Sequence, residues 1–258
     1  MFQLVRRSLC MRCLCVLFFL ILITAAVLCY NYYANRDALW NIISQQCLPH
    51  HAMGEGPAPC ARVDEKQGIV VYKDRNGPLQ HLLIPSIKIT GIESPLLLSS
   101  ATPNYFEQAW QARHFMSEKY GAPVPDSDIA LTVNSPLGRT QYQLHIHISC
   151  LLPLVKNQLV NQRDTISNQW QSFGLLLGHH YQAKRVTAAQ LHHEGAFRIL
   201  AQGIQGTDQQ MGHYGLAMAA LGDGDFVLLA TKRRLSDLNR ASAEEIQDHS
   251  CKILPVPP

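Results

Sequence analysis

QYQLHIHISCL, residues 141–151, alternates polar with apolar side chains over most of its length. A β-strand places residues two apart on the same face. One face of the expected strand therefore carries four polar side chains, Gln143, His145, His147 and Ser149. Twelve of the 258 residues are His, so the His-x-His spacing alone would suit a strand with two solvated imidazoles better than a catalytic site.

Three segments upstream extend the same pattern. Two apolar runs around an Asn-Gly turn predict a β-hairpin over residues 68–86. Apolar side chains at helical spacing, with Thr102 as cap and Gly121 as stop, predict a helix over residues 103–120. Residues 129–135 predict the strand that precedes 141–151. Helices and neighbouring strands in this order indicate an α+β fold.

The C-terminal part continues this mixture of elements. We expect helices over residues 154–168 and 188–201, a strand over 179–187, and a second hairpin over 215–232. Both hairpins run into a basic residue, which hints at an internal duplication, although apolar hairpins are common.

Composition limits the class of protein. Hydrophobic residues make up 47% and charged residues 16%, which excludes a disordered chain. The formal net charge is +3, and most of the basic residues are scattered. A dense basic face is typical of nucleic-acid binding, so we expect no nucleic-acid partner.

An uncharged run over residues 13–30 predicts a transmembrane helix, because about twenty residues cross a bilayer. Three arginines precede the run, which predicts a cytoplasmic N-terminus, and tyrosines follow it. A cleaved secretory signal is the alternative. The expected division is a cytoplasmic N-terminus (1–12), a signal anchor (13–30), a juxtamembrane helix and linker (31–62) and an exported domain with a C-terminal extension (63–258).

Four of the eight cysteines fall in the expected exported part: Cys47, Cys60, Cys150 and Cys251. An even number in an oxidising compartment predicts disulfides. Three pairings are possible, and Cys47 with Cys60 and Cys150 with Cys251 is the favoured one, because the first closes a short loop.

The neighbourhood of the two histidines resembles the histidine triad (HIT-like) superfamily of nucleotide hydrolases and transferases, whose signature alternates three His with apolar residues. Asn134 and Gln141 hold the positions that members fill eleven and four residues before the first His. LLIPSIK at 82–88 resembles the upstream strand of the family. The chain departs from the signature at Ser149, where the third His would stand, and at Tyr142, where Ser or Thr is common.

Within this superfamily the string QLHIHISC and the expected anchor resemble a bacterial branch that hydrolyses CDP-diacylglycerol to CMP and phosphatidate. The resemblance implies a HIT-like antiparallel sheet with packed helices, preceded by one transmembrane helix. It also implies a single-pass protein of the inner membrane with its catalytic domain in the periplasm, a liponucleotide substrate in the membrane, and no cofactor.

The resemblance further implies the site residues. His147 would attack the phosphate as nucleophile, with His145 as the second catalytic histidine. Asn134, Gln141 and Ser149 would bind the phosphate oxygens. Arg139 and Lys88 are further candidates for substrate binding, because their charge could supply positive potential at the phosphate.

Two other classes of function remain open at this point. A metal-dependent hydrolase could use His145 and His147 as ligands, although no third ligand is evident. A non-catalytic module that binds nucleotide or lipid would need neither chemistry. Activity that survives a chelator and is lost with His147 would separate the first reading from both.

Overall fold

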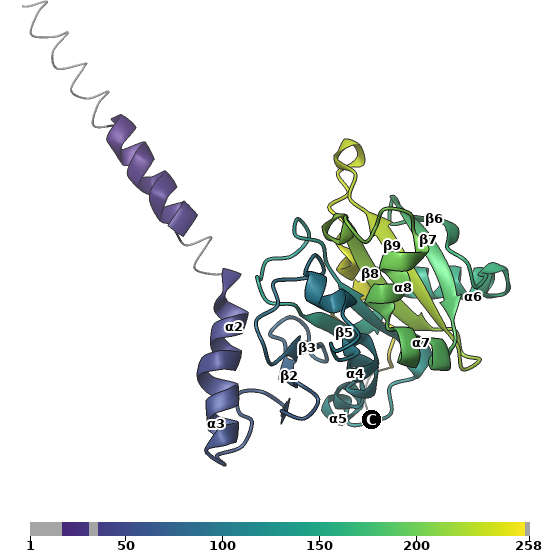
Figure 1. Cartoon of the computed structure of the whole chain (residues 1–258), viewed down its shortest axis with the longest axis horizontal. Coiled ribbons are helices and arrows are strands. Elements are labelled where there is room, and N and C mark those ends of the chain that lie inside the picture. The colour runs from purple at the N-terminus through teal and green to yellow at the C-terminus, as the bar shows by residue number, and fades with distance from the viewer. Residues whose placement is uncertain (1–16, 31–35, 256–258) are drawn as a thin grey trace, which may run out of the picture.

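One antiparallel sheet runs through the molecule (Figure 1), and the computed structural model describes residues 17–30 and 36–255. The strands are β1 (Arg62–Asp64), β2 (Ile69–Lys73), β3 (His81–Pro85), β4 (Ile129–Val133), β5 (Ile146–Leu151), β6 (Gln171–Leu176), β7 (His179–Val186), β8 (Tyr214–Ala220), β9 (Phe226–Lys232) and β10 (Gln247–Asp248). Their order is β1-β2-β3-β5-β4-β8-β9-β7-β6, with β10 against β5. The expected mixture of helices and antiparallel sheet is confirmed.

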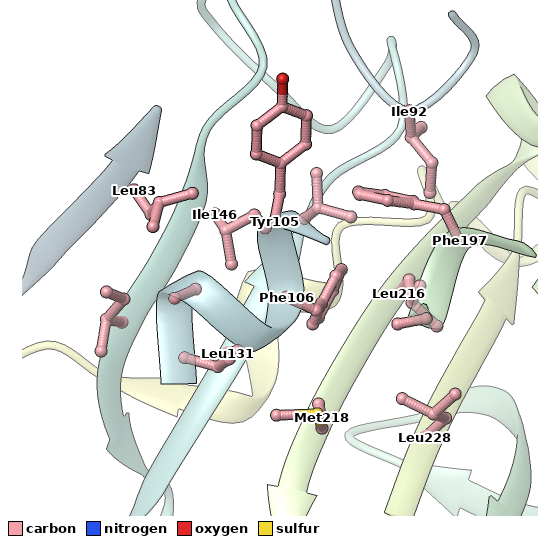
Figure 2. Close-up of a cluster of buried hydrophobic side chains, with 14 of the residues drawn as sticks. Leu83, Ile92, Tyr105, Phe106, Leu131, Ile146, Phe197, Leu216, Met218 and Leu228 are labelled. Carbon is pink, nitrogen blue, oxygen red and sulfur yellow. The ribbon is translucent and has the colours of Figure 1, made fainter. Parts of the chain in front are cut away.

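Helices cover both faces of the sheet. They are α2 (Ala38–Ile42), α3 (Leu48–Ala52), α4 (Tyr105–Gln111), α5 (His114–Tyr120), α6 (Pro153–Gln162), α7 (Ala188–Glu194) and α8 (Ala196–Gly203), with one π-helical turn, η1 (Ile43–Cys47), between α2 and α3. The largest core lies under α4 and α8 (Figure 2). There the rings of Phe106 and Phe197 meet edge to face at 5.2 Å, so the two helices are packed through aromatic contacts.

Two smaller apolar clusters lie on the opposite face. Leu39 and Ile43 of the N-terminal helical segment pack with Leu82 of β3, and α6 packs over the other half of the sheet. The register places His147 of β5 next to Leu82, between the two clusters. The polar face of β5 is therefore left open between the N-terminal helical segment and α6.

The chain repeats one arrangement twice: a helical segment, a hairpin, a helix and two more strands. The strand order β2-β3-β5-β4 of the first half corresponds to β6-β7-β9-β8 of the second, and β4 pairs with β8 in the middle. Where β4 and β8 meet, Thr132 pairs with Ala217. On the other side of β4, Thr132 pairs with His147 of β5, whereas at the equivalent place in the second half Ala217 pairs with Leu229 of β9. The structure thus favours an internal duplication, but it matches the hairpin 68–86 with β6–β7 rather than with β8–β9. Only the first half carries the two histidines.

The predicted hairpins over 68–86 and 215–232 are confirmed, whereas several other bounds were wrong. The helix expected over 103–120 is two helices, α4 and α5, and its cap is Asn104 rather than Thr102. The helix expected over 188–201 is interrupted at Gly195, whose φ of +74° does not fit a helix.

The expected transmembrane helix over 13–30 is corrected by the structure. Residues 1–16 lie outside the described residues, and residues 17–30 form a helix of fourteen residues. Across 17–30 and 36–255, none of the helices has the length and apolar character that a membrane crossing needs. The predictions of a single-pass anchor, and of an inner-membrane protein with a periplasmic catalytic domain, were therefore wrong.

Both favoured disulfides are confirmed, Cys47–Cys60 and Cys150–Cys251. The second joins β5 to the segment that follows β10. This places residues 243–251 beside the strand that carries His147.

Candidate active site

A cleft of about 410 Å³ opens at the polar face of β5. Its walls come from α2, the loop after β2, the loop after β4 and the C-terminal segment. The residues that line it are Ala38, Leu39, Ile42, Tyr72, Asp74, Arg75, Asn76, Leu82, Asn134, Gly138, Arg139, Thr140, Gln141, His145, His147 and Glu244. Both predicted catalytic histidines thus lie in one cavity.

His147 is 5% exposed, and its two ring nitrogens have different surroundings. Nδ1 lies 3.0 Å from Nε2 of Gln80 and 3.3 Å from Oε1 of Glu244. Nε2 is buried and has no hydrogen-bond partner within the described residues. Burial lowers the pKa of His147, while the carboxylates of Glu244 and Asp74 raise it in part. The resting ring is therefore neutral near pH 7.

Glu244 is held from three sides. Its side chain accepts from Nδ2 of Asn134 at 2.8 Å and contacts Nε2 of His249 at 3.0 Å, in addition to His147. Burial raises the pKa of Glu244, but His147, His249 and Asn134 outweigh this and lower it to about 2. Nδ1 of His147 has two neighbours that favour opposite tautomers. The amide of Gln80 can donate only to an unprotonated Nδ1, whereas the ionised Glu244 favours hydrogen on Nδ1, the form in which Nε2 carries a lone pair for attack.

His145 packs edge to face against His147, with ring centroids 4.8 Å apart. Its Nδ1 lies 2.6 Å from the carbonyl oxygen of Gln143, so the hydrogen is on Nδ1. Burial, followed by the influence of His147, lowers the pKa of His145 to about 4. Both imidazoles are thus neutral, with Nε2 as the atom left for a ligand.

The other predicted binding residues divide into two groups. Asn134, Gln141 and Arg139 line the cleft, although each already has a structural contact. Asn134 holds Glu244, Oε1 of Gln141 accepts from the backbone N–H of Leu39 at 2.9 Å, and Arg139 is paired with both oxygens of Glu93.

Ser149 and Lys88 lie outside the cleft lining. Ser149 is fully buried in β5, and its hydroxyl has no partner within the described residues. Lys88 forms an ion pair with Asp37 at 2.5 Å at the start of α2. Neither side chain therefore lines the cleft around the histidines, although Ser149 follows His147 on the same face of β5.

Sequence reasoning missed Glu244, His249, Gln80 and Asp74. Gln80 bridges the site, because its Nε2 lies 2.7 Å from Oδ2 of Asp74 and 3.0 Å from His147. Glu244 and His249 come from a C-terminal segment that carries no alternating pattern. The one available signal was Cys251, since the favoured disulfide with Cys150 would bring this segment to β5.

Within 17–30 and 36–255, His, Cys, Asp and Glu side chains form no group of three or more that could hold a metal ion. What the cleft offers instead is a neutral imidazole with a carboxylate behind it. That arrangement suits a nitrogen nucleophile whose positive charge, once it has reacted, is balanced by the carboxylate.

Comparison with known proteins agrees on one family. The family model described as CDP-diacylglycerol pyrophosphatase matches residues 34–255. A protein of Yersinia pestis described as CDP-diacylglycerol pyrophosphatase is 54% identical over 245 residues, which is 95% of each chain.

Proposed function

The chain belongs to the CDP-diacylglycerol pyrophosphatase family, and we propose that it works through a nucleotidyl-histidine intermediate on His147. Its activity is hydrolysis of the pyrophosphate bond of CDP-diacylglycerol to CMP and phosphatidate, a reaction of phospholipid metabolism. The observation that carries the mechanism is the surroundings of the His147 ring: Nδ1 lies 3.3 Å from Glu244, and Nε2 has no hydrogen-bond partner among residues 17–30 and 36–255.

In the first step Nε2 of His147 attacks the phosphorus of the CMP phosphate. A P–N bond forms, and the bond from that phosphorus to the bridging oxygen breaks. Phosphatidate leaves as an anion that carries the bridging oxygen, and it needs no proton for this. Holding the nucleophile in line with the leaving oxygen is the main contribution of the site.

In the second step a water molecule attacks the same phosphorus, and the P–N bond breaks. The products are CMP and the original neutral His147, with one proton released from the water. The imidazole ring carries a positive charge between the two steps. Glu244 supports this charge, because its carboxylate lies against Nδ1 and is ionised at neutral pH.

The neighbouring groups position the ring and the phosphate. An anionic phosphate in the cleft would raise the pKa of the adjacent His145 and allow Nε2 of that ring to donate to a phosphate oxygen. Asn134 acts through Glu244, which it holds at 2.8 Å. The resemblance to the histidine triad superfamily supports these roles, since its signature places the nucleophile at the middle histidine.

The test is to trap the intermediate. Full-length protein is mixed for milliseconds with CDP-diacylglycerol labelled in the CMP phosphate and quenched in base, where phosphohistidine bonds survive and acid cleaves them. Label should appear on a peptide that contains His147, with and without EDTA. Turnover that is lost with EDTA and restored by a divalent ion would favour the metal-dependent alternative, and turnover without trapped label in His147→Ala would contradict the mechanism.

A further inference from the structure

A second cavity of about 720 Å³ adjoins the catalytic cleft. Residues 138–141 line both cavities, so this short loop forms the wall between them. An extended ligand with its reacting phosphate at His147 could therefore continue over the loop into the second cavity. Nothing in the mechanism above uses this space.

Positive charge lines the second cavity. Arg36 and Arg240 both contribute to its walls. The guanidinium of Arg36 contacts the hydroxyl of Tyr142, which fixes its position. Arg240 is exposed, and its guanidinium has no carboxylate within salt-bridge distance among the described residues. An arginine without an acidic partner at a cavity wall suits a phosphate group.

Exposed leucines gather at the same place. Leu137, 44% exposed, and Leu235, 64% exposed, line the cavity beside the arginines. Leu238, 82% exposed, belongs to the same loop after β9. Apolar side chains grouped in solvent around a cavity mark a site for an apolar ligand. Arginine and leucine on one wall fit a ligand that is a phosphate at one end and a hydrocarbon at the other.

We propose that this second cavity binds the phosphatidyl half of the substrate. The phosphate of the leaving group lies near Arg36 and Arg240, and the glycerol and the first part of the acyl chains lie on Leu137 and Leu235. The CMP half occupies the first cleft, where Asp74 and Asn76 offer polar groups for a nucleoside. The assignment rests on the proposed function, which places the reacting phosphate at His147.

Calorimetric titration of the full chain with the two products tests the assignment, because neither product requires turnover. The probes are CMP and short-chain phosphatidates that stay monomeric, with butanoyl or hexanoyl chains. In the unmodified protein the affinity should rise from the butanoyl to the hexanoyl ligand. Leu235→Ser should weaken hexanoyl phosphatidate about fivefold and flatten the dependence on chain length, because it removes apolar contact area.

Arg240→Gln should weaken both phosphatidates about tenfold and leave their ratio unchanged, because it removes a charge-assisted contact to the phosphate. Leu154→Ser is the matched control. Leu154 is 63% exposed on α6 and lines neither cavity. This variant should bind all three ligands as the unmodified protein does.

Retained CMP affinity shows that each variant is folded. Unchanged phosphatidate binding in both Leu235→Ser and Arg240→Gln, or an equal loss of CMP binding, would overturn the assignment. So would an equal loss in Leu154→Ser. Failure to trap a labelled His147 alongside these binding results would instead overturn the covalent mechanism and leave the phosphatidyl cavity in place.

Discussion

Oε1 of Glu244 lies 3.3 Å from Nδ1 of His147, and both side chains line the same cleft. The carboxylate is itself fixed by Asn134 and His249, so it cannot turn away without breaking those contacts. A strand near the middle of the chain thus supplies the nucleophile, and the C-terminal segment supplies the charge that balances it. This relationship makes the site sensitive to changes on either side.

Substitutions at the histidine face should form an ordered series. His147→Ala should abolish turnover and trapping, because it removes the proposed nucleophile. His145→Ala and Gln141→Ala should lower kcat by up to about 10²–10³, the usual loss for one stabilising group. Ser149→Ala should do least, because Ser149 is buried outside the cleft lining. Steady-state rates and labelled-peptide yield measure the series, and near-normal turnover in His147→Ala would contradict it.

Glu244→Gln should lower kcat and shift the acid limb of the kcat/KM profile to lower pH. Attack requires neutral His147, so activity is lost as the pH falls through the pKa of this ring. Burial lowers that pKa, which places the acid limb of kcat/KM below pH 6.5. Glu244 raises the pKa of His147, so its removal should move the limb to still lower pH. A limb that moves to higher pH would show that Glu244 does not act on His147 through its charge.

Loss of the Cys150–Cys251 disulfide should affect both stability and turnover. Replacing both cysteines by Ser should lower the free energy of unfolding by about 4 kcal/mol, because the bond closes a long loop. It should also lower kcat, since the bond holds the segment of Glu244 beside β5. The matched control is the double Ser variant of Cys47 and Cys60, which close a short loop. Urea titration and rates compare the two, and a larger loss of kcat in the control would count against this view.

Gly77→Ala should damage the site through a steric contact. A Cβ at Gly77 would lie 1.9 Å from the carbonyl oxygen of His249, so the backbone of His249, whose side chain contacts Glu244, must move. A displacement of this kind can cost about 10² in rate. Gly178→Ala is the control, because Gly178 also has a positive φ, +89°, but open space around it. Both variants should lose about 1–2 kcal/mol of stability from the backbone. Equal kcat values in Gly77→Ala and Gly178→Ala would show that the contact with His249 does not affect catalysis.

Local patterns predicted the parts of the fold that depend on neighbouring residues. The Asn-Gly turn gave the hairpin over 68–86, and alternation placed His147 on the polar face of β5, with His145 just before the strand and in the same cleft. Alternation failed for Gln143, because the strand begins only at Ile146. The Gln143 amide instead donates to the carbonyl oxygens of Pro85 and Ile87 and holds that loop.

The missed site residues are those placed by tertiary contacts. Glu244 and His249 reach His147 only through the fold and the Cys150–Cys251 bond, so no spacing in the sequence marks them. Lys88 was expected to act on phosphate but is paired with Asp37 on the N-terminal helical segment. The apolar run at 13–30 matched the composition of a membrane helix, whereas its described part is too short for one.

The pairing of β4 with β8 has a consequence for any attempt to shorten the protein. A fragment that ended after β5 would keep both histidines, yet it would expose the N–H and C=O groups of β4 that now bond to β8. Apolar residues of β4, such as Leu131 and Val133, would then lie on an unpaired edge strand, which readily pairs with a strand of another molecule. The second half, which lacks the His-x-His pair, therefore acts as a covalently attached partner that closes this edge, and the isolated first half should aggregate or pair with itself.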